Sequence, residues 1–164
     1  MIRALFIATW LVLTPSFVWA QERTCTDKPE CWPGGSAMHT GLILNQERRQ
    51  KEKLLTRKHN ELLKIVGPPQ SDGLHTDLSL LDALKNQQVA WLKYRSEECT
   101  LIGSLTGAGG TWPSAYASRC ELNHTEQRLS RVLSALRCVK RIPSNNQIIQ
   151  QNDCLQQLAP LTNK

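Results

Sequence analysis

The chain has 164 residues, 40% of them apolar, and a formal net charge of +6 at pH 7. This length excludes a large multidomain protein and leaves one domain with a modest core. The charge is basic without being extreme, so it is compatible with an anionic partner such as an envelope polymer, a lipid head group or nucleic acid, and equally with simple solubility.

The first twenty residues have the layout of a secretory signal peptide. Arg3 supplies the positive start, residues 4–13 form an apolar run, and residues 18–20 offer a small-x-small cleavage site. The run is shorter than the roughly twenty residues of a membrane helix, so we expect cleavage and no membrane anchor. Cys25 lies too far beyond the cleavage site to accept a lipid. Cleavage leaves a charge of +5 and an exported chain, for which nucleic acid is not an expected partner.

Residues 21–40 are predicted to form an irregular N-terminal arm. Two prolines and two glycines between positions 29 and 35 interrupt helices and strands. Residues 41–164 are then predicted to form a single helical domain, because no strand alternation and no internal repeat is visible in them.

Apolar residues recur at steps of three and four through most of this domain, which predicts helices. The predicted helices cover residues 42–66, 74–102, 112–140 and 147–158. A Gly-Pro-Pro sequence ends the first, and four glycines between 103 and 110 make a bend before the third, where Thr111 can cap the helix and Pro113 occupies its first turn. The predicted fold is all-α: a small antiparallel helical bundle of three long helices plus a short C-terminal helix.

Six cysteines in an exported chain predict disulfides formed in an oxidising compartment. They permit fifteen pairings, and nearness in sequence favours three pairs. These pairs are Cys25 with Cys31, Cys99 with Cys120, and Cys138 with Cys154. Loops of these lengths contribute about 2 to 3 kcal/mol each in the chain-entropy treatment, so we expect a disulfide-stapled bundle.

Aromatic and arginine side chains share one face of the second predicted helix. Trp91, Arg95 and Cys99 lie at steps of four residues, and Tyr94 flanks them. We expect the two aromatic residues to be core or partly buried, and the alternative is an exposed binding patch built from the same residue types.

A buried guanidinium without a partner costs several kcal/mol. Arg95 is therefore predicted to clamp helices together through a carboxylate or a set of carbonyls. The candidate carboxylates are Glu98, Glu121 and Glu126. Arg128, three residues after Thr125, is interpreted in the same way.

The segment that contains these residues has a recognisable pattern. Its first part reads Trp-x-x-Tyr-Arg-x-x-x-Cys and its second Cys-x4-Thr-x-x-Arg, with Gly109-Gly110-Thr111 and Tyr116 between them. Over about residues 81–136 the pattern resembles the LprI-like lysozyme-inhibitor N-terminal domain family of bacterial exported proteins. The resemblance implies a helical, disulfide-linked domain in the periplasm or outside the cell and, for some members, inhibition of lysozyme.

Lysozyme as a partner raises a question of charge, because animal lysozymes are strongly cationic and this chain is basic. Binding then requires a local acidic patch or an inserted loop. Two glycine-rich segments, 31–35 and 103–112, each contain a tryptophan, and the alternative is that both are only connecting loops. The candidate partner-binding residues are Trp32, Gly109, Gly110 and Trp112.

Six basic residues cluster on the first predicted helix, and glutamates interleave with them at pairing distance, which favours a solvated face. The basic residues are Arg48, Arg49, Lys51, Lys53, Arg57 and Lys58. The alternative is a strip that contacts anionic polymers or lipids, which would make the protein a structural or accessory envelope protein.

The sequence contains no arrangement of catalytic groups. Its four histidines are scattered without the spacing of a zinc site, and no cysteine pair has the two-residue gap of a metal knuckle. The glycine-rich bend lacks the lysine and hydroxyl of a phosphate loop. We therefore expect a binding protein that is not an enzyme and that uses no cofactor and no metal.

Overall fold

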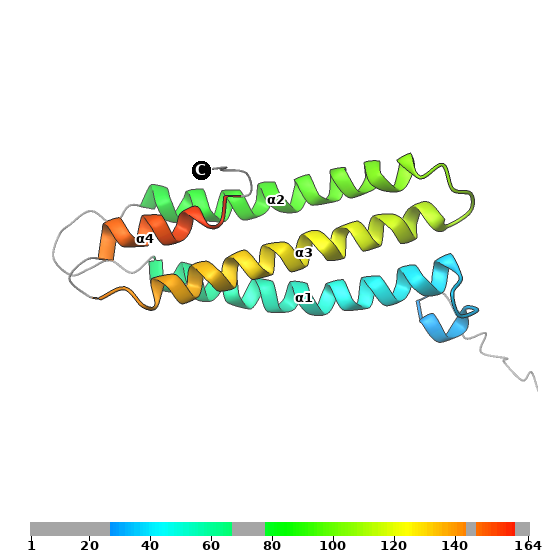
Figure 1. Ribbon diagram of the computed structural model, residues 1–164, viewed down its shortest axis with the longest axis horizontal. Helices are drawn as coiled ribbons and strands as arrows, with labels where there is room; N and C mark the ends of the chain where they lie inside the picture. Colours follow the sequence, from blue (N-terminus) through cyan, green and yellow to red (C-terminus); the bar gives the residue numbers. More distant parts are fainter. Residues whose placement is uncertain (1–26, 67–77, 144–146, 160–164) are drawn as a thin grey trace, which may run out of the picture.

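The computed structural model describes residues 27–66, 78–143 and 147–159. The predicted signal peptide and Cys25 lie outside these residues. A short 3-10 helix, η1 (Pro29–Cys31), precedes four α-helices: α1 (Ala37–Val66), α2 (Leu78–Leu105), α3 (Trp112–Val139) and α4 (Gln147–Gln156) (Figure 1). The predicted all-α fold with three long helices and a short C-terminal helix is confirmed. No helix in the described part of the chain has the length and apolarity needed to cross a membrane.

α1 begins five residues earlier than the periodicity predicted. The Ser36 hydroxyl accepts a hydrogen bond from the backbone N–H of His39 at 3.2 Å, and its carbonyl accepts one from Thr40 at 2.9 Å. A serine in this position satisfies an N–H group that the first helical turn leaves without a partner. The helix therefore starts directly after the Pro-Gly-Gly sequence that was predicted to extend the irregular arm.

The start of α3 differs in detail from the prediction. Thr111 occupies the N-cap position, but its ψ of 4° is outside the extended region and its hydroxyl makes no capping bond. The Thr111 carbonyl instead accepts the N–H of Ala115 at 3.3 Å. Pro113 lies in the first turn, as expected of a residue without an N–H group.

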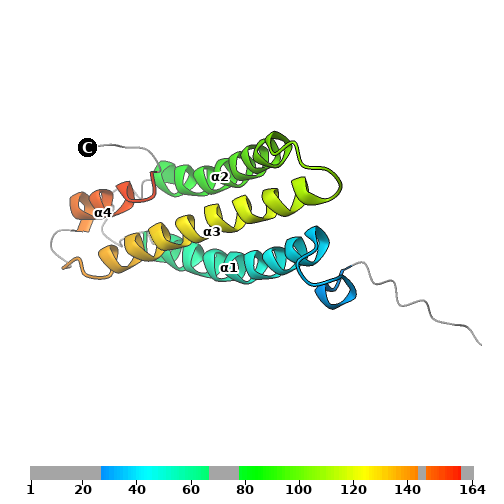
Figure 2. The same cartoon turned by 45° about the vertical axis from the view of Figure 1, so that its right-hand side comes forward.

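α3 is the central helix, because it packs against α1 and α2 and also meets α4 (Figures 1 and 2). Cross-helix pairs between α1 and α3 advance together along both helices: Asn45 with Ser118, Arg48 with Glu121, Lys51 with Glu126, and Glu61 with Lys140. These two helices are therefore parallel. Pairs between α2 and α3 run in opposite directions, as Cys99 with Cys120 and Gln88 with Arg128 show. Successive helices are thus antiparallel.

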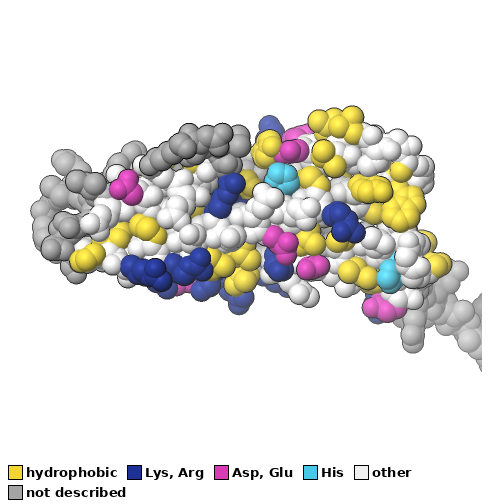
Figure 3. All heavy atoms as spheres, in the orientation of Figure 1, with side chains coloured by type: hydrophobic (Ala, Val, Ile, Leu, Met, Phe, Trp, Pro, Cys, Tyr) yellow, Lys and Arg dark blue, Asp and Glu magenta, His cyan; other side chains and the backbone are white. Residues whose placement is uncertain are grey.

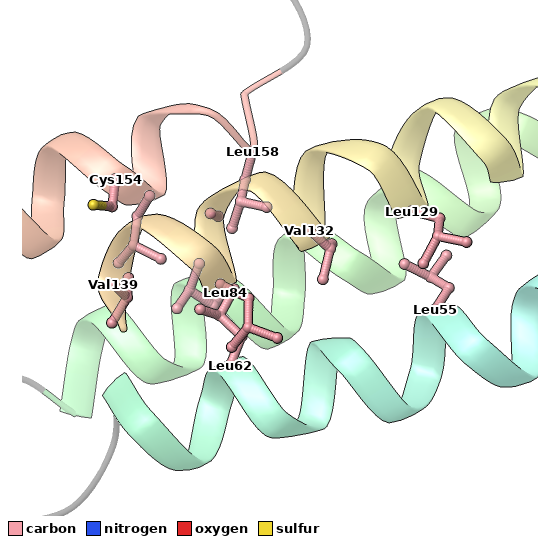
Figure 4. Packing of buried hydrophobic residues seen from close by; sticks show 11 residues of the cluster. Leu55, Leu62, Leu84, Leu129, Val132, Val139, Cys154 and Leu158 are labelled. Carbon is pink, nitrogen blue, oxygen red and sulfur yellow. The ribbon is translucent and has the colours of Figure 1, made fainter. Parts of the chain in front are cut away.

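The hydrophobic core lies toward the end of the bundle that α4 covers (Figure 4). Its buried members are Leu55, Leu62, Leu84, Leu129, Val132, Ala135, Leu136, Val139, Cys154, Leu155 and Leu158. α4 closes this core, and the disulfide between Cys138 and Cys154 ties it to the end of α3.

The opposite end of the bundle is held by close backbone approach. A Cβ atom on Gly103 of α2 would lie 2.6 Å from the carbonyl oxygen of Pro113, so only glycine fits there. Gly41 of α1 lies against Ala115 of α3 in the same way, with more room.

The described residues contain two of the three predicted disulfides. Cys99 and Cys120 join α2 to α3 with a Cα–Cα distance of 5.4 Å, and the corresponding distance for Cys138 and Cys154 is 5.5 Å. Both distances are usual for disulfides, and both pairings are confirmed. The predicted partner of Cys31 lies outside the described residues, so that pairing stays a prediction.

Candidate functional site

Arg95 connects the three long helices at the middle of the bundle. Arg95 is 6% exposed, and its guanidinium donates from Nη2 to Glu52 Oε1 of α1 at 2.6 Å. Nη1 donates to Thr125 Oγ1 of α3 at 2.8 Å, and the Thr125 hydroxyl donates in turn to the Glu121 carbonyl at 2.7 Å. Arg95 is thus a buried clamp, as predicted from its position beside Trp91 and Cys99.

The predicted carboxylate partners of Arg95 are wrong. Glu121 pairs with Arg48 at 3.0 Å, Glu126 pairs with Lys51 at 2.9 Å, and Glu98 lies beside His124 at 3.5 Å. The actual partner, Glu52, is 43 positions away on α1, and nearness along α2 and α3 does not reveal it.

One signal in the sequence points to Glu52. Leu44, Arg48, Glu52 and Leu55 recur at steps of four, four and three, so they share a face of α1. Two charged residues inside an apolar stripe indicate an ion pair, and Arg48 Nη1 does donate to Glu52 Oε2 at 2.8 Å in a partly buried pair.

Arg128 is buried without a carboxylate partner among the described residues. The residue is 3% exposed, and its guanidinium donates to three neutral oxygens: Gln88 Oε1 at 3.1 Å, Gln87 Oε1 at 2.8 Å and the Leu158 carbonyl at 2.9 Å. Burial, and to a smaller extent the positive charge of Arg131, lowers the pKa of Arg128 to about 10. The predicted set of carbonyls is therefore present, and part of it comes from the segment that follows α4.

Trp91 contacts both buried arginines. The guanidinium carbons of Arg95 and Arg128 lie 5.0 Å and 5.7 Å from the centroid of its ring, within cation–π distance. Trp91 is half buried, whereas Tyr94 is 56% exposed and meets the His124 ring edge-on at 5.9 Å. A hydrogen bond to the Glu98 carboxylate raises the pKa of Tyr94. The expectation of a core or partly buried aromatic residue therefore fits Trp91 and does not fit Tyr94.

The turn between α2 and α3, with the adjoining helix ends, forms an exposed apolar surface. We call residues 101–118 the hairpin tip; this segment contains no charged residue. Its exposed apolar residues are Leu101 (56%), Ile102 (42%), Leu105 (70%), Trp112 (41%) and Tyr116 (44%). The space-filling view shows hydrophobic side chains gathered at this end of the molecule, whereas the largest group of basic side chains lies toward the other end (Figure 3). Exposed apolar patches of this kind are typical of protein-binding sites.

Three of the four predicted partner-binding residues, Gly109, Gly110 and Trp112, lie on the hairpin tip, and Trp32 lies next to η1. Trp112 lies on the hairpin tip and packs against Tyr116, with ring centroids 6.1 Å apart. Gly110 has a φ of 63°, which favours glycine, whereas Gly109 has open space around it. Trp32 follows η1, which lies at the same end of the bundle in both ribbon views (Figures 1 and 2). It is half buried, and its indole N–H is enclosed without a hydrogen-bond partner among the described residues.

Cys99, Cys120 and His124 lie close enough together to suggest a metal site, with candidate ligand atoms within 4.8 Å of one another. The two cysteines are bonded to each other, so they offer no thiolate. This group therefore does not argue for a metal.

A profile of the family described as lysozyme inhibitor LprI matches residues 31–131. The match covers more than half of the chain, including α1, α2 and most of α3. This chain belongs to the LprI family. The resemblance inferred from residues 81–136 is confirmed and extends to the first helix. No curated protein and no solved structure matches the chain. α4 lies beyond the LprI match, so the Leu158 carbonyl that holds Arg128 comes from outside the matched region.

Proposed function

We propose that this protein binds and inhibits a lysozyme outside the cytoplasm, and that the hairpin tip is the surface it uses. The single observation that supports this surface is the set of exposed apolar side chains on the tip, five of which are 41% to 70% exposed. Membership of the LprI family supports lysozyme as the partner. The two disulfides between described cysteines are consistent with an oxidising compartment.

The hairpin tip could contact a cationic lysozyme without charge repulsion at the contact itself. The chain carries a formal charge of +6, and like charges disfavour contact with a cationic enzyme. Residues 101–118 carry no charged side chain. Burying their apolar side chains against a partner therefore stabilises the complex without placing two positive charges next to each other.

The tip is held in place before any partner arrives. The Cys99–Cys120 disulfide closes its base, and Gly103 brings α2 within close contact of Pro113. A surface ordered in advance loses less conformational entropy on binding, which favours affinity. An uncharged apolar surface that is ordered in this way is suited to contact a cationic enzyme.

The test is a lysis assay with bacterial cell walls, a lysozyme and the purified oxidised protein. We expect saturable inhibition by the wild type. Leu105→Lys places a charge at the most exposed apolar residue of the tip and should raise the inhibitory concentration at least about tenfold.

Val89→Lys is the matched control. Val89 is 67% exposed on the same helix, against 70% for Leu105, but lies outside the tip. Its inhibitory concentration should stay within about twofold of the wild type. Equal effects of the two variants would reject the tip as the contact surface, and absence of inhibition by the wild type would reject the proposed function.

A second candidate function rests on a different face. Arg49, Lys53 and Arg57 lie at steps of four on α1, with Lys64 seven residues further on; all four are exposed, and none forms an ion pair with a described residue. This stripe supports an accessory envelope protein that contacts anionic polymers or lipids.

This second function predicts binding to vesicles that contain anionic lipid, with loss at raised salt. Changing Arg49, Lys53 and Arg57 together to glutamine should abolish that binding. Arg48 and Lys58 are poor choices for this test, because they already pair with Glu52, Glu121 and Glu61. Vesicle binding that survives the triple change would argue against the stripe.

A further inference from the structure

A cavity of about 450 Å³ lies between α2 and α3, away from the hairpin tip. Gln87, Trp91 and Tyr94 line it from α2, and His124, Arg128 and Arg131 line it from α3. Its size is in the lower part of the range of sites for small organic ligands. We call it the α2–α3 pocket.

The described lining of the α2–α3 pocket contains positive charge and no carboxylate. Two arginines line it, and no aspartate or glutamate is among its described lining residues. Glu98 contacts His124 and Tyr94 but does not line the pocket. An anion that enters therefore meets positive charge without a competing lining carboxylate.

Arg128 is the buried positive charge that an anion in the pocket would meet. Arg95, the other buried arginine, is compensated by Glu52, but the acceptors around Arg128 are two amide oxygens and one backbone carbonyl. A guanidinium has five N–H groups, and these three bonds leave two for a ligand. Because a buried charge without a counter-charge is costly, an anion beside Arg128 would be stabilised more than one at the surface.

Part of the pocket wall is aromatic, because Trp91, Tyr94 and His124 line it. Trp91 is already fixed by its contacts with Arg95 and Arg128, and Tyr94 is fixed by the His124 ring. Rigid aromatic faces favour a flat, apolar ligand body, because such a body stacks on them with little loss of conformational freedom. Charge and shape thus favour the same kind of ligand.

We propose that the α2–α3 pocket binds a small aromatic carboxylate, with its ring against Trp91 and Tyr94 and its carboxylate on Arg128. This site is separate from the hairpin tip and does not depend on lysozyme inhibition.

The probe is 2-naphthoate, and 2-naphthalenemethanol serves as its neutral counterpart. Binding is followed by calorimetry and by the indole N–H signals of the tryptophans in ¹⁵N-labelled protein, assigned with single Trp→Phe variants. We expect a dissociation constant on the order of 0.1 to 1 mM for naphthoate, as ordinary ligand efficiency gives, and at least about tenfold weaker binding of the alcohol. The Trp91 signal should shift and the Trp112 signal should not.

Two variants connect the binding to the pocket. Arg128→Gln should weaken naphthoate at least about tenfold while leaving the alcohol unchanged. Because this change affects a buried residue, Ala90→Trp is a second test: Ala90 is exposed, lines the pocket and can fill it without disturbing the core. Val89→Trp is the matched control, since the exposed Val89 is not a lining residue.

Ala90→Trp should abolish naphthoate binding and Val89→Trp should retain it. The proposal is overturned if folded wild-type protein gives no Trp91 shift at 5 mM naphthoate, on the order of five times the weakest expected constant. Equal binding of the neutral alcohol, or full binding by Ala90→Trp, would overturn it as well.

Discussion

Two buried arginines near Trp91 are stabilised in different ways. Arg95 has a carboxylate and a hydroxyl, and its carboxylate is shared with Arg48. Arg128 has only neutral acceptors and a pKa lowered to about 10. The first arrangement is a structural clamp that joins three helices, and replacing Glu52 would leave a buried charge alone. The second arrangement leaves two N–H groups of the buried Arg128 guanidinium without one of these acceptors, and the proposed ligand site depends on them.

His59 is a further buried polar residue, and it makes stability depend on pH. It is 5% exposed, and burial, followed by the charge of Arg128, lowers its pKa, while a backbone hydrogen bond at Leu84 opposes the shift. The unfolded chain therefore binds a proton near pH 6.5 that the folded chain does not bind. Stability should fall as the pH drops below about 6.5, and the loss should level off only below the pKa of the folded histidine.

The measurement is the free energy of unfolding in urea at pH 7.5 and at pH 5.0. The wild type should lose more stability between these values than His59→Gln does. His39→Gln is the control for the substitution itself, because it replaces a histidine that is only half buried. Identical pH dependence in wild type and His59→Gln would contradict the assignment.

At the scale of elements, the distance between α2 and α3 is set by a glycine inside a helix. Gly103 is buried, and a Cβ atom there would meet the Pro113 oxygen at 2.6 Å and the Ala117 Cβ at 3.2 Å. Glycine costs helix stability of roughly 1 kcal/mol relative to alanine, so close packing must offset that cost.

Gly103→Ala should therefore destabilise the protein by about 1 to 3 kcal/mol, although alanine is the better helix former. Chemical unfolding measures this. Gly109→Ala is the control, since it has open space and should be neutral or slightly stabilising. Stabilisation by Gly103→Ala would mean that the helices can separate without cost.

The helices themselves were predictable, because three- and four-residue periodicity, glycine clusters and prolines are local signals. The predicted third helix begins at Trp112, as α3 does, and cysteine spacing identified two disulfides correctly. The start of α1 was missed because a single serine cap outweighed the turn-forming residues before it. Side-chain partners were missed where they depend on the arrangement of helices. Glu52 of α1 reaches Arg95 of α2 only because both helices pack against α3, and the Leu158 carbonyl reaches Arg128 only because α4 folds back.

At the scale of the molecule, the hydrophobic core and the exposed apolar surface lie at opposite ends of the bundle. Leucine-rich packing lies under α4, buried polar bonds occupy the middle, and the hairpin tip keeps apolar side chains in solvent. One disulfide fixes each end: Cys99–Cys120 below the tip and Cys138–Cys154 beside the core. The tip can therefore present a binding surface without support from the leucine core.

This separation predicts different consequences for the two disulfides. Replacing either pair by serine should cost about 2 to 4 kcal/mol, because their loops have similar lengths. Loss of Cys99–Cys120 should lower the amide hydrogen-exchange protection of residues 99–120 and weaken inhibition. Loss of Cys138–Cys154 should release α4, deprive Arg128 of the Leu158 carbonyl and leave protection at the tip unchanged. If both variants lose protection over the same residues, the bundle opens as one unit, and the tip is not independent of the core.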